Sequence, residues 1–191
     1  MGSAHEPADA ATSMTQAAVG ISGRIGSGKT TFAESLSERL GCPHASFGKY
    51  VHSVAIEQGL DAGERQVLQT LGEDLIATVG WHDFCNAVLE YAGYQSGSVV
   101  IDGVRHVDAI ATLRELTAAV PWYLVAIDVD EAEIGRRRTS RGDDLASIAR
   151  SESHRNEAQV GDVRALADII VPAGVAIEEA LTMVLGRIHQ S

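Results

Sequence analysis

The eight residues from Gly23 to Thr30 carry the clearest chemical pattern in the sequence, because GRIGSGKT fits GxxxxGK(S/T) without a mismatch. Glycines let backbone N–H groups turn inward around a phosphate, where a Cβ would clash or forbid the required φ. In such a loop Lys29 bridges the β- and γ-phosphates, and the Thr30 hydroxyl is offered to Mg²⁺. The pattern predicts a site for ATP and Mg²⁺, whose nucleotide-binding residues are Gly23, Gly26, Ser27, Gly28, Lys29, Thr30 and Thr31.

A second candidate is the carboxylate of Asp102, which ends the apolar run VVID. Functional groups gather at the carboxyl ends of parallel strands, so Asp102 is expected beside the glycine-rich loop, holding Mg²⁺ directly or through water. The alternative is an aspartate that only caps the next helix. Arg105 follows three residues later and is expected to point into the same cleft, where it could bind an anionic acceptor.

Arginines are concentrated between residues 136 and 155. Arg137 and Arg141 are four residues apart and would share a helical face, so both could reach one phosphate chain. Arginines on such a segment stabilise charge on a transferring phosphoryl group and help to exclude water. We therefore expect a short lid at residues 136–146 with Arg137 and Arg141 as catalytic residues. The alternative is a solvated basic stripe paired with Asp143 and Asp144.

Buried strands and amphipathic helices alternate along the chain and would position these groups. Apolar runs at residues 17–22, 98–102, 122–128 and 167–171, with a weaker one at 44–47, predict five strands. The alternation predicts an α/β fold, a three-layer α/β/α arrangement around a five-stranded parallel sheet. We expect one domain at residues 17–191 after a disordered tail at 1–16, and a helical acceptor-binding insertion at 48–93, broken at 59–63 and at Gly80.

Composition narrows the classes of partner. A formal net charge of -11 argues against general attraction to a nucleic acid polymer or to an anionic membrane. No apolar run reaches the roughly 18 residues of a membrane span. Cys42 and Cys85 have no metal-binding spacing and are expected to be free thiols. The expectation is a cytoplasmic protein, monomeric or homodimeric, that acts on a small phosphorylated molecule.

Together these elements resemble the nucleoside monophosphate kinases, including adenylate kinase, from about residue 19 to 188. Residues 46–52 (SFGKYVH) follow the frame of that family's acceptor element S-T-G-D-x-x-R, with Lys49 in place of the acid and His52 in place of the arginine. The DGVR sequence that ends at Arg105 is similar to the family's D-G-F-P-R with one residue missing. The resemblance implies that Lys49, His52 and Arg105 bind the acceptor phosphate. It also implies that Arg137 and Arg141 are lid arginines.

The C-terminal part is also similar to the dephospho-CoA kinases, through RNEAQ at residues 155–159 and ADIIV at 167–171. This resemblance implies that the loop containing Pro172 and Gly174 lies beside the adenine. Dephospho-CoA kinases carry an aspartate after the second strand to deprotonate a ribose hydroxyl, but residues 45–49 contain no carboxylate. A phosphate acceptor needs no such base.

Within the insertion, Trp81 and Phe84 could stack on a base, although burial in the core is the commoner fate of such aromatic residues. The leading hypothesis is an ATP-dependent kinase for a nucleoside or deoxynucleoside monophosphate. A dephospho-CoA kinase or another small-metabolite kinase is the alternative within the enzymes. A regulatory P-loop module that hydrolyses ATP slowly is the alternative from another class.

Overall fold

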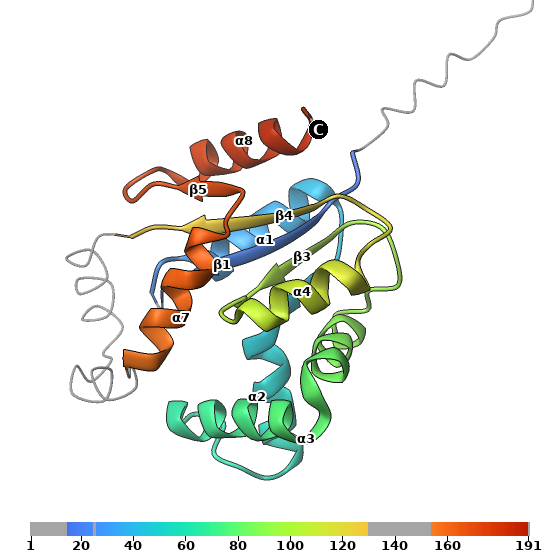
Figure 1. Ribbon diagram of the computed structural model, residues 1–191, viewed down its shortest axis with the longest axis vertical. Coiled ribbons are helices and arrows are strands. Elements are labelled where there is room, and N and C mark those ends of the chain that lie inside the picture. The colour runs from blue at the N-terminus through green and yellow to red at the C-terminus, as the bar shows by residue number, and fades with distance from the viewer. Residues whose placement is uncertain (1–14, 25, 130–153, 191) are drawn as a thin grey trace, which may run out of the picture.

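The computed structural model describes residues 15–24, 26–129 and 154–190, and the side chains of 154–158 are not described. Most of the expected tail, the expected lid at 136–146, Arg137 and Arg141 lie outside these ranges. Within them the sheet has five parallel strands in the order β2-β3-β1-β4-β5 (Figure 1). The strands are β1 (Ala18–Gly23), β2 (His44–Ser46), β3 (Val99–Asp102), β4 (Trp122–Ile127) and β5 (Ile169–Val171). The predicted α/β fold with a five-stranded parallel sheet is confirmed.

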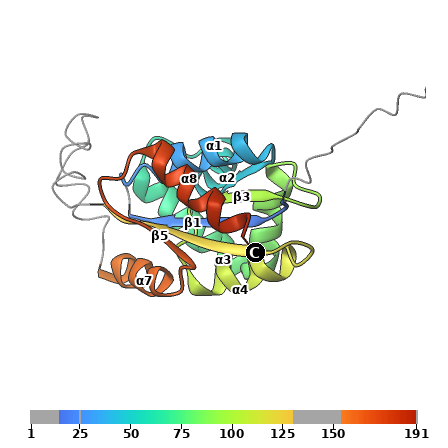
Figure 2. The same cartoon turned by 90° about the horizontal axis from the view of Figure 1, so that it is seen from above.

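Helices cover both faces of the sheet (Figure 2). The described helices are α1 (Lys29–Leu40), α2 (Phe47–Glu57), α3 (Arg65–Tyr91), α4 (Val107–Leu116), α7 (His154–Ala165) and α8 (Ile177–Ile188). One core lies between the sheet and the pair α1 and α8, where Phe32, Leu36 and Leu181 are buried. A second core lies on the opposite face, with Leu113 and Leu124 at 0% exposure. None of these described helices is long and apolar enough to span a lipid bilayer.

Strand β1 is the centre of the sheet, because β3 and β4 flank it on its two sides. Its residue Ala18 lies opposite Val99 on β3 and Trp122 on β4. All six residues of β1 are buried, as expected for a parallel strand covered on both faces. Gly20 leaves room for the Trp122 ring, which a Cβ at that position would approach to 2.7 Å. This register brings the carboxyl ends of β1 and β3 to the same edge of the sheet.

Helices α2 and α3 lie between β2 and β3 in the chain and project away from the sheet (Figure 1). Ser46 begins α2 as its N-cap, and its hydroxyl accepts a hydrogen bond from the Lys49 backbone N–H at 3.4 Å. Gly80 kinks α3 at φ 77° and ψ 170°, a conformation that is essentially confined to glycine. The part of α3 after the kink is anchored in the core by Phe84 and Val88. We call α2 together with α3 the α2–α3 lobe.

Candidate functional site

The glycine-rich loop joins the end of β1 to the start of α1. Gly26 and Gly28 have φ values of 86° and 84°, in the left-handed region that favours glycine. At Gly23 a Cβ would stand 2.9 Å from the backbone oxygen of Ile127. No side chain caps the N-terminus of α1, so the backbone N–H groups of its first turn remain available to an anion. The loop has the form expected of a phosphate cradle.

Lys29 is the first residue of α1 and is only 9% exposed. Its ammonium group donates to the backbone oxygen of Arg24 at 3.4 Å. Burial lowers the pKa of Lys29 from 10.5 to about 8, and the positive charge of Arg105 adds to that effect, while Asp102 opposes it. A buried ammonium whose charge is disfavoured in this way gains from an anion placed next to it. Lys29 is therefore suited to bind phosphate.

The depressed pKa of Lys29 makes nucleotide binding pH-dependent. A bound polyphosphate stabilises the ammonium form, so binding above the free-state pKa of about 8 must take up a proton. We expect uptake of a small fraction of a proton at pH 7 and of nearly one proton at about pH 9. Calorimetric titration with ATP and Mg²⁺, in buffers that differ in ionisation enthalpy, measures this uptake.

The control for this titration is Lys29→Arg, because a guanidinium stays charged over the whole range. Its proton uptake should not rise between pH 7 and pH 9. If proton uptake by the wild-type protein did not rise between pH 7 and pH 9, Lys29 would not contact the phosphates.

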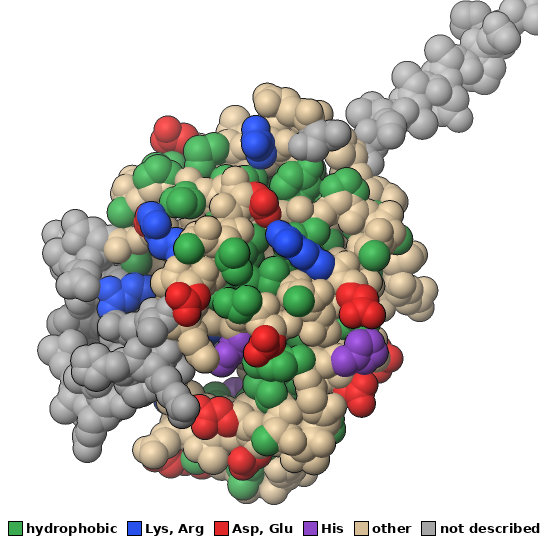
Figure 3. Space-filling model, viewed as in Figure 1, with side chains coloured by type: hydrophobic (Ala, Val, Ile, Leu, Met, Phe, Trp, Pro, Cys, Tyr) green, Lys and Arg blue, Asp and Glu red, His purple; other side chains and the backbone are tan. Residues whose placement is uncertain are grey.

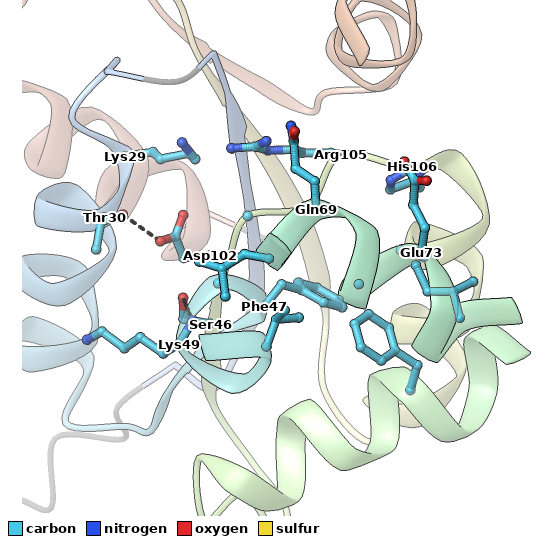
Figure 4. Close-up of a pocket in the computed structure, with 18 of the residues that line it drawn as sticks. Lys29, Thr30, Ser46, Phe47, Lys49, Gln69, Glu73, Asp102, Arg105 and His106 are labelled. Carbon is cyan, nitrogen blue, oxygen red and sulfur yellow. Dashed lines mark hydrogen bonds between the residues drawn. The ribbon is translucent and has the colours of Figure 1, made fainter. Parts of the chain in front are cut away.

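Asp102 and Thr30 meet at the carboxyl edge of the sheet. The Thr30 hydroxyl donates to Asp102 Oδ2 at 2.8 Å, as Figure 4 shows. Asp102 is 3% exposed, and its Oδ1 has no hydrogen-bond partner among the described residues. The same holds for the buried Ser27 Oγ. A buried carboxylate oxygen without a partner is costly unless something binds it.

Mg²⁺ fits this arrangement. It prefers hard oxygen ligands, usually one or two from the protein with the rest from water and phosphate. The Thr30 hydroxyl and the Asp102 carboxylate supply such oxygens next to the phosphate cradle. Thr30 and Asp102 are therefore the residues that would hold the ion, and their role as magnesium ligands stays a prediction.

A single cavity of about 540 Å³ extends from Lys29, Thr30 and Asp102 to the α2–α3 lobe. The hollow is visible between the lobe and the sheet in Figure 3, where acidic side chains are scattered over the same face. Two of the arginines that the structure describes, Arg65 and Arg105, line the cavity. The remainder of its wall is largely apolar and includes Phe47, Val51, Leu68, Ile76, Trp81 and Phe84.

The three residues expected to bind an acceptor phosphate differ from one another in their position relative to the cavity. Arg105 lines the cavity and points toward Lys29 (Figure 4). Lys49 lies at its edge, but its ammonium is turned toward α1 and pairs with Glu34 Oε1 at 2.8 Å. His52 is exposed on α2 and is not among the residues that line the cavity. The structure therefore brings Arg105 to the site and does not bring His52 there.

The two aromatic residues expected to stack on a base both line the cavity. Phe84 is also a core residue at 3% exposure, and its ring lies 5.5 Å from Phe47 and 6.3 Å from Trp81 between centroids. Trp81 is partly buried, and its ring lies 4.9 Å from that of His106. Phe84 thus supports the wall from the core, whereas Trp81 forms part of the wall surface.

For several residues that line the cavity, the sequence predicted no individual role. Gln69 and Glu73 lie one turn apart on α3, and Phe47 opens α2. His106 lies directly after Arg105, in the connection between β3 and α4. The lining residues of α3, at positions 65, 69, 72, 73 and 76, recur at helical spacing. This spacing is the sequence signal that could have identified them.

Several other expected site residues that the structure describes do not line this cavity. Pro172 and Gly174 belong to the connection between β5 and α8, where Gly174 has a φ of 81°. Neither lines the cavity described above. Their expected place beside the adenine stays a prediction, as do the catalytic roles of Arg137 and Arg141. Thr31 is exposed on the first turn of α1.

Comparison with solved structures finds chains of the same fold. A shikimate kinase from Aquifex aeolicus is 18% identical with a TM-score of 0.60, and the match covers 90% of this chain and 96% of that chain. A gluconokinase from Sinorhizobium meliloti is 14% identical with a TM-score of 0.54, covering 91% and 92% of the two chains. A shikimate kinase from Bacteroides thetaiotaomicron is 15% identical with a TM-score of 0.53, covering 92% and 99%.

A comparison with curated proteins finds no match. A family model described as AAA domain matches residues 22–154, which is more than half of the chain and includes the glycine-rich loop, Asp102 and Arg105. These similarities, together with the parallel sheet and the phosphate cradle, show that the chain belongs to the AAA domain family and has the P-loop kinase fold.

Proposed function

We propose that the chain is an ATP-dependent kinase that transfers the γ-phosphoryl group to a small phosphorylated acceptor, a nucleoside or deoxynucleoside monophosphate. One observation carries the proposal: a single cavity connects the phosphate cradle with an α2–α3 lobe that carries an arginine and an aromatic wall. At about 540 Å³ it is within the usual range for small-molecule sites, roughly 300–1,000 Å³.

The donor side of the cavity fits ATP. Backbone N–H groups of the loop and of the first turn of α1 would hold the phosphates, and Lys29 would place a positive charge beside them. Mg²⁺, when bound through Thr30 and Asp102, supplies charge neutralisation at the phosphoryl group. The residues of the chain thus provide positioning and electrostatic stabilisation, which are the main needs of phosphoryl transfer.

The acceptor side of the cavity fits an anion. Arg65 and Arg105 both line it, and both lower the pKa of Lys29 through their charge, so all three cations act on one region. An acceptor phosphate oxygen would form the new bond to the γ-phosphorus as the bond to the β–γ bridging oxygen breaks. ADP then leaves with that oxygen.

A phosphate acceptor is preferred over a hydroxyl acceptor because the described wall of the cavity offers few general bases, namely the imidazole of His106 and two carboxylates. Among the described lining residues only Glu73 and Asp102 are carboxylates. Asp102 accepts from Thr30 at the donor end, and Glu73 lies beside His106 (Figure 4). A hydroxyl nucleophile needs a base within hydrogen-bond reach, whereas a phosphate is already an anion.

A coupled assay of ADP release tests the proposal. The wild-type protein would be supplied with ATP, Mg²⁺ and one acceptor at a time: ribo- and deoxynucleoside monophosphates, dephospho-CoA, shikimate or gluconate. ADP release should increase strongly with a nucleoside monophosphate. Release that is slow and equal with every acceptor would instead indicate a regulatory module with ATPase activity.

The variant Arg105→Ala separates acceptor binding from donor binding. Loss of a charged hydrogen-bonding group from an anion site should raise the KM for the acceptor by about 10- to 100-fold. The KM for ATP should change by less than about 3-fold. Arg114→Ala is the matched control, because Arg114 is exposed on α4 and does not line the cavity. If the KM for the acceptor and the KM for ATP changed equally, Arg105 would not be a residue that binds the acceptor.

A further inference from the structure

Three polar side chains that no phosphate requires also line the cavity: Gln69, Glu73 and His106. Gln69 and Glu73 are four residues apart on α3, so their side chains share one face of the helix. Figure 4 shows both rising toward the connection between β3 and α4, with Gln69 beside Arg105 and Glu73 beside His106. Burial lowers the pKa of His106, and the charge of Glu73 is among the effects that oppose this shift, in agreement with their proximity.

Apolar and aromatic surfaces flank these polar groups. Trp81 packs against His106 with ring centroids 4.9 Å apart, and Phe47 packs against Phe84 at 5.5 Å. Both Trp81 and Phe47 line the cavity. A flat ring could lie against such a surface and present its edge to the polar residues of α3. The arrangement is that of a site for a heteroaromatic ring with a hydrogen-bonding edge.

The polar groups impose a definite pattern on that edge. A carboxylate only accepts hydrogen bonds, so the two oxygens of Glu73 can accept from two adjacent donors. The Gln69 amide can donate. Burial lowers the pKa of His106, which favours the neutral imidazole, and this form has one N–H to donate. The matching ligand edge has two neighbouring donors followed by an acceptor.

We propose that Glu73 is a specificity-determining residue that selects a guanine base, so that the acceptor is guanosine or deoxyguanosine monophosphate. Guanine presents an amino group, a ring N–H and a carbonyl oxygen in that order. Glu73 accepts from the first two, and Gln69 or His106 donates to the third. The inference rests on the proposed function, since it names the acceptor for that same site.

The other common bases match this pattern less well. Cytosine presents one donor and two acceptors, so lone pairs would face the carboxylate. Thymine and uracil place a carbonyl oxygen on each side of their single ring N–H, and one of these would face a Glu73 oxygen. Adenine offers only its amino group beside a ring nitrogen that accepts. A polar group of the base that is left without a partner in the cavity, or is set against a like group, costs binding free energy.

The test compares guanosine monophosphate with inosine monophosphate, which lacks only the amino group. In the wild-type protein kcat/KM for guanosine monophosphate should exceed that for inosine monophosphate by about 10- to 100-fold, the effect of one hydrogen bond to a charged group. In Glu73→Gln the ratio should fall to about 1–3, because the carboxamide has a single acceptor oxygen. Asp74→Asn is the control, being the same change of charge at an exposed neighbour that does not line the cavity. It should keep the wild-type ratio.

The possible outcomes separate the inference from the proposed function. If ADP release responds to no acceptor, the kinase proposal fails, and this inference fails with it. If some nucleoside monophosphate is phosphorylated but the wild-type ratio is near one, only the choice of guanine fails. An unchanged ratio in Glu73→Gln, with circular dichroism showing a folded protein, would assign base selection to another residue.

Discussion

Lys29→Met should abolish nucleotide-dependent activity and raise the melting temperature of the ligand-free protein. Turnover should fall by at least about 10²- to 10³-fold, because a preorganised positive charge is lost from the phosphate site. The stability gain follows from the pKa of Lys29, which falls from 10.5 to about 8 on folding. That difference corresponds to about 3 kcal/mol against the folded state. Methionine removes the buried charge at similar length.

The pH dependence of this gain has a definite sign. A lysine whose pKa is lowered on folding destabilises the protein fully below that pKa, because the ammonium is then charged in both states. The destabilisation fades as pH rises from about 8 toward 10.5, where the folded form has released its proton first. The advantage of Lys29→Met should therefore be largest below pH 8 and shrink above it.

Thermal denaturation with and without ATP and Mg²⁺ measures both effects. We expect the ligand-free melting temperature to rise by about 6–12 °C and the shift caused by nucleotide to disappear. Lys49→Met is the control for stability, because its ammonium is exposed and pairs with Glu34 only at the surface. It should change the melting temperature little. A lower melting temperature for Lys29→Met at pH 7 would contradict the argument.

Asp102→Asn should remove the dependence on Mg²⁺ while leaving the fold intact. The asparagine side chain has nearly the same shape and can keep the hydrogen bond from Thr30, now 2.8 Å long. Its amide is a poor ligand for Mg²⁺, so charge neutralisation at the phosphoryl group is lost. That loss is worth several kcal/mol, and kcat should fall by about 10²- to 10⁴-fold.

The direct readout is the effect of the ion on nucleotide binding. In the wild-type protein ATP should stabilise more in Mg²⁺ than in EDTA, and Asp102→Asn should lose this difference. Asp108→Asn, at an exposed position of α4, is the matched control and should retain it. If Mg²⁺ increased the stabilisation by ATP as much in Asp102→Asn as in the wild-type protein, Asp102 would not be a ligand of the ion.

The fold and the donor half of the site could be predicted from the sequence because their signals are local. A buried parallel strand appears as a continuous apolar run, and β1 and β3 have this form. The glycine-rich loop lies between such a strand and a helix, and the backbone conformation it requires restricts the residues directly. Asp102 follows from the rule that strand ends share one edge of a sheet.

The acceptor half could not be predicted in the same way, because it depends on how helices are turned. His52 lies one position after the buried Val51, about 100° around α2, and it is therefore on the solvent side. Lys49 pairs with Glu34 on α1, and no local sequence pattern predicts this pair. The kink at Gly80 sets the direction of the first part of α3, which carries Gln69 and Glu73. These directions arise from tertiary packing.

The central position of β1 has a consequence for how the protein is made. Ala18 finds its two strand partners only at Val99 and Trp122, roughly 80 and 100 residues later in the chain. At a ribosomal elongation rate of about 5–20 residues per second, the first of these partners emerges about 4–16 seconds after β1. During that time an apolar strand stands without neighbours, while α2 and α3 can already form from local contacts. Newly synthesised chains therefore pass through a stage in which the apolar β1 is open to chaperones or to aggregation.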